Sequence, residues 1–230
     1  MLIGPQNLTV PVNHVRSRIS HAALAAGRDP GAVVLVAVTK AKTAENIRAA
    51  ATAGVTDFGE NYLQEALAKM DQLADLSLRW HFIGAIQSNK TASIAERFDW
   101  VHSVDRLNIA RRLSEQRSFH APPLEVCIQV ALEPEPKKGG VAPAGLAELA
   151  AAVAVLPRLR LRGLMCVPPP QPHAAAMRPV FARLRGLLEE LNAGGLKLDT
   201  LSMGMSADFE YAIAEGATMV RIGTALFGNR

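Results

Sequence analysis

Strand-like and helix-like segments alternate along this chain, and the alternation limits its possible folds more than any other feature of the sequence. The clearest strand-like run, Val33–Lys40, is almost uniformly apolar and β-branched, which is typical of a strand buried on both faces of a parallel sheet. The predicted strands are Val33–Lys40, Thr56–Asn61, Trp80–Ile86, Trp100–Ser103, Leu124–Leu132, Leu159–Val167, Thr200–Met205 and Thr218–Gly223.

Each predicted strand except the last is followed by a segment in which apolar residues recur at helical spacing. An additional amphipathic helix precedes the first strand. It carries Leu8, Val12, Val15 and Ile19 on one face, and Gly27 ends it. The predicted helices between the strands are Thr43–Ala53, Tyr62–Leu73, Thr91–Arg97, Asp105–Ser118, Ala144–Leu156, Met177–Leu191 and Ala207–Glu215.

Eight strands with helices between them predict one α/β domain over residues 1–230, a (β/α)8 TIM barrel with an extra N-terminal helix. An open doubly wound sheet has the same alternation and is the alternative fold. We prefer the barrel because eight is the number of strands that closes it.

The composition is that of a globular protein and argues against several functions. The formal net charge is +4, but there is no block of five or six like charges, so we expect no nucleic-acid binding; a small phosphorylated ligand suits the same charge. We expect no membrane partner and no signal peptide, because the chain lacks the apolar segments that these require. Cys127 and Cys166 lie in apolar runs, as reduced core thiols of a cytoplasmic protein do. The cysteines and scattered histidines indicate no metal site.

Lys40 is the most informative residue for function. Period-two alternation puts Val34, Val36, Val38 and Lys40 on one face of the first strand, so the lysine ends a row of interior side chains. Such a lysine is costly, because keeping its amine neutral at pH 7 requires roughly 4.6 kcal/mol. Proteins that keep a lysine amine neutral usually use it as a nucleophile or to form a Schiff base. The alternative is a surface lysine that closes a strand.

The ends of the last two predicted strands offer a phosphate site. In a (β/α)8 barrel the active site lies at the carboxyl ends of the strands, and phosphate commonly binds after strands seven and eight. Ser206 follows the seventh strand, and Gly223 and Thr224 follow the eighth. Two hydroxyls, a flexible glycine and the N–H groups of a helix start could hold a phosphate there. Alternatively, Ser206 is a simple N-cap, and Gly223 and Thr224 form a turn.

Several sequence blocks, spread over nearly the whole chain, carry a family resemblance. They are Val36-Ala-Val-Thr-Lys40, Phe58-Gly-Glu-Asn-Tyr62 with Gln64-Glu65, His81-Phe-Ile-Gly84 with Gln87 and Asn89-Lys90, His102-Ser-Val-Asp105, Gly163-Leu-Met165, Leu201-Ser-Met-Gly-Met-Ser206, and Val220-Arg-Ile-Gly-Thr224 with Phe227-Gly228. With these blocks the chain resembles the pyridoxal phosphate homeostasis proteins, single-domain relatives of the alanine racemase N-terminal barrel, of fold type III.

The resemblance implies pyridoxal phosphate as the cofactor and a set of residues that hold it. They are Lys40, which forms the internal aldimine; Ser206, Gly223 and Thr224 at the phosphate; Arg221 at the pyridine nitrogen; Asn61 and Met203 along the cofactor; and His81. A histidine on a strand is as often a core residue with satisfied hydrogen bonds, so His81 has that alternative interpretation.

Some positions depart from the family pattern. Ala41 and Ala44 stand where the family usually has threonine and proline after the lysine, and Ala131 replaces an asparagine. Cys166 and Val167 follow Gly-Leu-Met, where threonine and methionine are commoner. These differences concern the rim of the expected site and leave the lysine and the phosphate residues in place.

Three functions remain open. The first is a monomeric carrier that holds pyridoxal phosphate at Lys40, serves intracellular vitamin B6 homeostasis and delivers the cofactor to apo forms of pyridoxal phosphate enzymes. The second is an amino-acid racemase-like enzyme of low activity, and the third is a Schiff-base aldolase acting on a sugar phosphate. We favour the carrier. Racemisation needs a second acid–base group, which alanine racemase takes from a further domain that is not expected here. In addition, Arg221 can only donate a hydrogen bond, so it suits an unprotonated ring nitrogen. An unprotonated nitrogen makes the cofactor a weaker electron sink.

Overall fold

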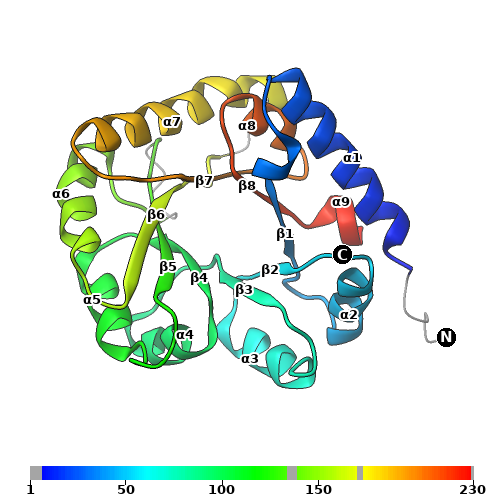
Figure 1. Cartoon of the computed structure of the whole chain (residues 1–230), viewed down its shortest axis with the longest axis horizontal. Coiled ribbons are helices and arrows are strands. Elements are labelled where there is room, and N and C mark those ends of the chain that lie inside the picture. Colours follow the sequence, from blue (N-terminus) through cyan, green and yellow to red (C-terminus); the bar gives the residue numbers. More distant parts are fainter. Residues whose placement is uncertain (1–6, 134–138, 170–172, 229–230) are drawn as a thin grey trace.

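Eight parallel strands form a closed barrel in the structure, a computed structural model that describes residues 7–133, 139–169 and 173–228. Neighbouring strands follow sequence order, and β1 pairs with β8 to close the barrel (Figure 1). The strands are β1 (Val34–Val38), β2 (Asp57–Glu60), β3 (Arg79–Phe82), β4 (Trp100–Val104), β5 (Leu124–Gln129), β6 (Leu159–Met165), β7 (Thr200–Met205) and β8 (Met219–Ile222). The predicted (β/α)8 barrel is confirmed, and the open sheet is wrong.

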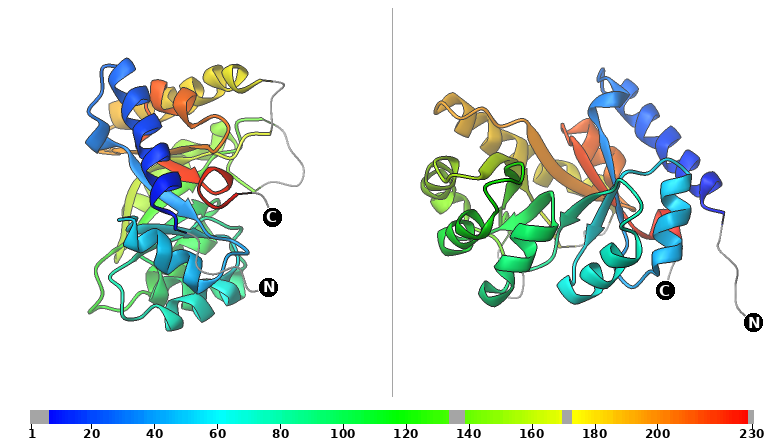
Figure 2. Two further views of the ribbon diagram at one scale, coloured as in Figure 1. Left: turned by 90° about the vertical axis from the view of Figure 1, so that its right-hand side faces the viewer. Right: turned by 60° about the horizontal axis from the view of Figure 1, so that its bottom comes forward.

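Helices surround the strands on the outside of the barrel (Figures 1 and 2). They are α1 (Thr9–Ala25), α2 (Ala44–Thr52), α3 (Leu63–Gln72), α4 (Thr91–Arg97), α5 (Leu107–Gln116), α6 (Pro143–Ala154), α7 (Arg178–Ala193), α8 (Phe209–Ala214) and α9 (Thr224–Phe227), with short 3-10 turns at Pro30–Ala32, Ser88–Lys90 and Ala174–Met177. The alternative of a turn after β8 is wrong, because the short helix α9 begins at Thr224. In the described residues, no helix combines the length and the apolarity needed to cross a membrane.

Local sequence signals account for the ends of α2, the helix that follows the predicted lysine. Thr43 accepts a hydrogen bond from the backbone N–H of Asn46, and the Asn46 side chain accepts one from the backbone of Thr43, so the two residues form a capping box. Gly54 follows the helix with φ of 87°, a conformation that favours glycine. Both ends agree with the sequence-based prediction to within one residue.

The core has two parts, as period-two alternation on each strand requires. One set of side chains fills the space between strands and helices, where Ala37 and Phe58 are fully buried. A smaller set points into the barrel and includes Val36 of β1, Trp100 of β4 and Met165 of β6. The inward face of β1 is therefore the one predicted from the sequence.

The additional helix α1 lies against α8 on the outside of the barrel, close to where β1 and β8 meet (Figures 1 and 2). Its apolar face is buried, including Val12 and Val15. Arg18 donates a hydrogen bond of 2.7 Å to Glu210 and lies 4.6 Å from the ring centre of Phe209. The combination of apolar burial and a cation–π contact attaches α1 to the α8 side of the barrel.

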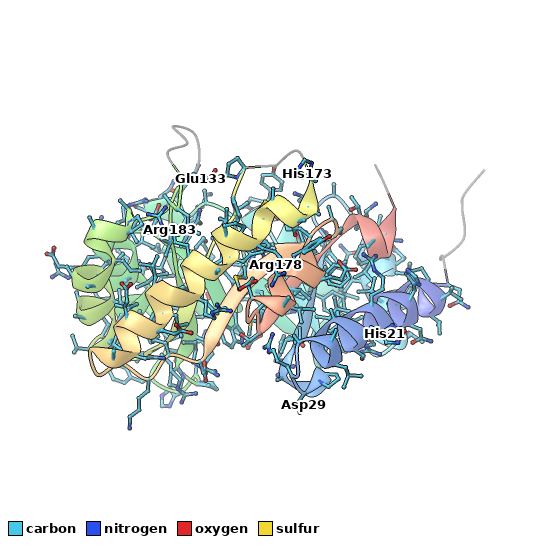
Figure 3. All side chains as sticks on the ribbon, turned by 90° about the horizontal axis from the view of Figure 1, so that it is seen from above. His21, Asp29, Glu133, His173, Arg178 and Arg183 are labelled. Atoms are coloured by element: carbon cyan, nitrogen blue, oxygen red, sulfur yellow. The ribbon has the colours of Figure 1, made fainter. Side chains whose placement is uncertain are left out.

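The barrel has two distinct ends. In Figure 3, Glu133 and His173, which follow β5 and β6, lie on one side, and Asp29, which precedes β1, lies on the opposite side. The carboxyl ends of all the strands therefore form one mouth. In (β/α)8 barrels, functional sites lie at that mouth.

Candidate functional site

A pocket of about 310 Å³ opens at the carboxyl ends of the strands, within the size range of small-molecule sites. It is lined by Val38, Lys40, Asn61, Ile83, Val167, Met205, Ser206, Ala207, Arg221, Gly223 and Thr224. The structure thus brings together most of the residues predicted from the sequence: Lys40, Asn61, Ser206, Arg221, Gly223 and Thr224.

Two predicted residues do not line this pocket. His81 is fully buried inside the barrel, where its ring nitrogens face Asp57 and His102. Met203 is fully buried in the outer core. In this structure both side chains lie outside the pocket lining.

Several apolar lining residues were not predicted. They are Val38, Ile83, Val167 and Met205, with Ala207 beside them. Val38 was detectable, because it shares the inward face of β1 with Val36. Met205 has 37% of its surface exposed at the mouth. These side chains give the pocket apolar walls suited to the faces of an aromatic ring.

Lys40 lies at the rim of the pocket and is exposed. As predicted, it follows Val38 at the pocket, but its side chain is not buried like an interior residue, because β1 ends at Val38 and the chain turns at Lys40. Among the described residues, no group lies within hydrogen-bonding or salt-bridge distance of its Nζ. The amine is therefore accessible to a ligand that enters the pocket.

The turn that follows β1 is held by a buried ionic cluster. Ala41 has φ of 58°, an uncommon conformation for a residue other than glycine, and its N–H donates a hydrogen bond of 2.6 Å to Glu65. The Nζ of Lys69 donates to Glu65, to the backbone oxygen of Thr39 at 2.7 Å and to Glu60 at 2.8 Å. Burial raises the pKa of Glu60, although Lys69 and Thr39 oppose that change. The cluster fixes the backbone on both sides of the pocket lysine.

The loops after β7 and β8 are joined through Ser206. Its Oγ accepts hydrogen bonds of 3.2 Å from the backbone N–H groups of Gly223 and Ala225. Ser206 is not the N-cap of α8, because that position belongs to Asp208. The hydroxyl instead ties the end of β7 to the start of α9.

Free backbone donors surround this junction. Within the described part of the chain, the N–H groups of Ser206, Ala207 and Thr224 have no hydrogen-bond partner. All three residues line the pocket. Clustered backbone N–H groups next to a glycine are a typical anion-binding arrangement.

Arg221 forms the floor of the pocket and is 4% exposed. Its Nη1 donates to Ser202 Oγ at 2.7 Å, and its Nη2 donates to the backbone oxygen of Cys166 at 2.8 Å. Burial lowers the pKa of the Arg221 guanidinium from its ordinary value. Among the described residues its Nε has no partner, so a hydrogen-bond donor remains for a ligand.

Asn61 brings an unused acceptor to the pocket. Its Oδ1 is buried and has no hydrogen-bond partner in the described residues. The backbone of Asn61 is held against the end of β3, since a Cβ at Gly84 would lie 2.0 Å from the Asn61 oxygen. A buried acceptor without a donor is unfavourable, and a ligand that donates a hydrogen bond would satisfy it.

Comparison with known proteins shows the family of this chain. Residues 12–230 match the sequence model of the family described as alanine racemase, N-terminal domain. A pyridoxal phosphate homeostasis protein of Pseudomonas aeruginosa is 63% identical over 216 residues, which are 94% of this chain and 93% of that protein. The chain belongs to the family of the pyridoxal phosphate homeostasis proteins.

Another relative and a solved structure are also similar over most of their length. The pyridoxal phosphate homeostasis protein of Escherichia coli is 50% identical over 219 residues, covering 94% of both chains. Among solved structures, that of PipY from Synechococcus elongatus with PLP bound has a TM-score of 0.86 and 39% identity, and the match covers 96% of this chain and 100% of PipY.

Proposed function

We propose that this protein binds pyridoxal phosphate as a Schiff base with Lys40 and delivers it to apo forms of pyridoxal phosphate enzymes, as part of cytoplasmic vitamin B6 homeostasis. The observation that carries the proposal is a single pocket in which an accessible amine, backbone N–H groups without partners among the described residues, and a buried guanidinium lie together. PipY, which has the same fold and 39% identity, is a pyridoxal phosphate-bound relative.

The residues fit the chemical groups of pyridoxal phosphate one by one. The backbone N–H groups of Ser206, Ala207 and Thr224 suit the phosphate. Arg221 suits the pyridine nitrogen, since a guanidinium only donates hydrogen bonds. The Oδ1 of Asn61, which has no partner within the described part of the chain, suits a hydrogen donor on the bound cofactor.

Covalent attachment needs the amine alone. The unprotonated Nζ of Lys40 attacks the aldehyde carbon, the C=N bond replaces C=O, and one water molecule leaves. Hydrolysis reverses the reaction and releases the cofactor intact. A reversible bond of this kind suits storage and delivery, while the phosphate contacts retain the cofactor when the bond is open.

The described lining residues favour a carrier over an enzyme. Apart from Lys40, they supply none of the usual proton-transferring side chains, since the remainder are apolar residues, glycine, asparagine, arginine, serine and threonine. Racemisation requires a second acid–base group on the opposite face of the substrate. Tyr62, next to Asn61, is 60% exposed and does not line the pocket. The alternative is a racemase-like enzyme of low activity.

Absorbance and chemical trapping test the binding. Pyridoxal phosphate added to the purified protein should give the visible band of a Schiff base, and borohydride should fix the cofactor on Lys40, as seen by peptide mass spectrometry. An adduct on another lysine, or none, would contradict the proposal. Transfer is measured by activity recovered in an apo-enzyme held across a dialysis membrane and, separately, in direct contact.

Turnover separates the carrier from the enzyme. The loaded protein is incubated with amino acids in deuterated water, and α-hydrogen exchange is followed by proton NMR. Exchange no faster than that caused by free pyridoxal phosphate is expected for a carrier. Rates typical of enzymes would establish the racemase-like alternative.

A further inference from the structure

A continuous chain of buried hydrogen bonds crosses the barrel from the cofactor pocket toward its opposite end. Arg221 Nη1 lies 2.7 Å from Ser202 Oγ, and Ser202 Oγ lies 2.7 Å from His102 Nδ1. His102 Nε2 then lies 2.9 Å from His81 Nδ1, and His81 Nε2 lies 3.0 Å from Asp57 Oδ1. We call these five residues the barrel relay.

The chemistry of the arginine end sets the direction of these bonds. A guanidinium has no acceptor, so Arg221 donates and Ser202 Oγ accepts. The single hydrogen of Ser202 is then available for His102 Nδ1, which accepts it. A neutral His102 therefore carries its hydrogen on Nε2 and donates it to His81.

The carboxylate end sets the same direction independently. Burial alone would raise the pKa of Asp57, but hydrogen bonds from His81, Thr56 and Arg79 outweigh burial and lower it to about 2. The ionised carboxylate accepts only, so His81 carries its hydrogen on Nε2 and accepts at Nδ1. His102 must then donate from Nε2, which is the state required by the arginine end.

The opposite direction is disfavoured by burial. It would require a cationic His81 between Asp57 and His102, and it would leave the hydrogen of Ser202 without an acceptor in the relay. His81, His102 and Ser202 are 0% exposed, so bulk solvent does not reach them. His81 also stacks on Trp100, with ring centres 5.7 Å apart and planes at 10°. Burial lowers the pKa of both histidines, which agrees with two neutral rings.

Arg221 depends on this arrangement for its orientation. Among the described residues, no carboxylate lies within salt-bridge distance of its guanidinium, and its partners are the Ser202 hydroxyl and the Cys166 backbone oxygen. The hydroxyl accepts from Arg221 in a fixed direction only while its own hydrogen is taken by His102. Without the His102 acceptor the Ser202 hydroxyl could rotate, and its lone pair would no longer be held toward Arg221 Nη1.

We propose that His102, supported by His81 and Asp57, is a positioning residue that holds Arg221 in the orientation used for the pyridine nitrogen. The inference rests on the proposed function only in naming the group that Arg221 meets. It also gives His81 a role that needs no contact with the cofactor.

The direction of the relay is measured without any cofactor. In the apo protein labelled with ¹⁵N-histidine, both relay histidines should be neutral Nε2–H tautomers at pH 7, assigned by comparison with His81→Gln and His102→Asn. An Nδ1–H tautomer or an imidazolium at either position would overturn the relay. Because no ligand is present, this result does not depend on whether the protein binds pyridoxal phosphate.

The positioning role is measured with substitutions at His102. Leucine removes the acceptor for Ser202, whereas the asparagine Oδ1 lies close to the place of the histidine Nδ1. We expect His102→Leu to weaken pyridoxal phosphate binding about tenfold and to shift the absorption band of the bound cofactor, and His102→Asn to restore most of both. Competition by inorganic phosphate should be unchanged, because the phosphate donors lie on other residues.

Two results would overturn the positioning role: wild-type binding and spectrum in His102→Leu, or equal loss in His102→Leu and His102→Asn. If His102→Leu does not fold, the histidine tautomers of the wild-type protein are the test, and an Nδ1–H tautomer or an imidazolium at His102 overturns the positioning role. Failure of the wild-type protein to bind pyridoxal phosphate would instead overturn the proposed function.

Discussion

Two neighbouring lysines show how local surroundings assign different roles to the same side chain. The Nζ of Lys40 has no partner among the described residues and borders the pocket. The Nζ of Lys42 donates a hydrogen bond of 3.3 Å to the backbone oxygen of Phe227. Lys42 thus connects the loop after β1 to α9, whereas Lys40 offers its amine to the cavity.

This difference predicts the outcome of exchanging each lysine for alanine. Lys40→Ala should keep the fold and abolish the borohydride-stable adduct, because the exposed side chain contributes no described contact. Some pyridoxal phosphate should still bind through the phosphate donors, detectable by equilibrium dialysis. Lys42→Ala is the matched control and should form the adduct. Loss of the folded state in Lys40→Ala, measured by circular dichroism, would show that Lys40 is a structural residue.

Asp57 predicts a specific contribution to acid stability. Its pKa is lowered to about 2 in the folded state, from an ordinary value of about 3.9. A depressed carboxyl pKa stabilises the fold above the unfolded-state value, and this stabilisation is lost as the pH falls through the folded-state value. We expect a loss of about 2 kcal/mol between pH 5 and pH 2 from this group.

The contribution is measured by urea unfolding of the wild type and of Asp57→Asn over the same range of pH as the expected loss. The asparagine keeps an acceptor for His81 but cannot ionise, so its stability should fall less steeply with acid. If the free energy of unfolding falls equally steeply with acid in both proteins, the assignment of this pKa to Asp57 is contradicted.

At the scale of elements, the carboxyl end of β7 depends on one glycine. Gly204 has φ of 90°, and a Cβ there would lie 2.6 Å from the Cβ of Ala212 on α8. Gly186, in the middle of α7, has nothing within 4 Å of the equivalent position. The same substitution therefore meets opposite conditions at a strand position and at a helix position of one barrel.

Gly204→Ala should lower the free energy of unfolding by about 2 kcal/mol, because it combines an unfavourable φ with a clash. Gly186→Ala should raise it by about 0.5–1 kcal/mol, since alanine is the better helix former. Denaturant unfolding of both variants measures whether each substitution lowers or raises the free energy of unfolding. Equal effects would show that φ and space at Gly204 are not limiting.

The sequence predicted the strands in order but extended several of them too far. Predicted strand Leu124–Leu132 is observed as Leu124–Gln129, yet Val130 and Leu132 are buried. An apolar run indicates that residues are buried, not that they pair with a neighbouring strand. Residues beyond the hydrogen-bonded part of a strand stay apolar where they line the pocket or the loops, as Val167 does. The carboxyl ends of strands in a barrel are therefore the least predictable limits.

At the scale of the whole molecule, the candidate pocket was more predictable than the barrel relay. Lys40, Ser206, Gly223 and Thr224 follow strands whose carboxyl ends must meet in any (β/α)8 barrel. His102 and Ser202 instead lie on β4 and β7, which are not neighbours. Whether their side chains meet across the interior depends on the stagger of the strands, which alternation along one strand does not specify.

The whole fold should report cofactor binding as a gain in stability. A ligand that binds only the folded state at 100 times its Kd adds about 2.7 kcal/mol, which corresponds to a rise in Tm of roughly 5–10 °C for a chain of this size. We expect that rise for the wild type with pyridoxal phosphate, measured by differential scanning calorimetry at concentrations fixed by the Kd of the wild type.

Two comparisons locate the source of this gain. Pyridoxal, which lacks the phosphate, should give a smaller rise at the same concentration, because it cannot use the N–H groups of Ser206, Ala207 and Thr224. Lys40→Ala with pyridoxal phosphate should also give a smaller rise, because only the non-covalent contacts remain. An equal rise with pyridoxal and with pyridoxal phosphate would contradict the phosphate site, since both ligands would then be held through the amine and the ring alone.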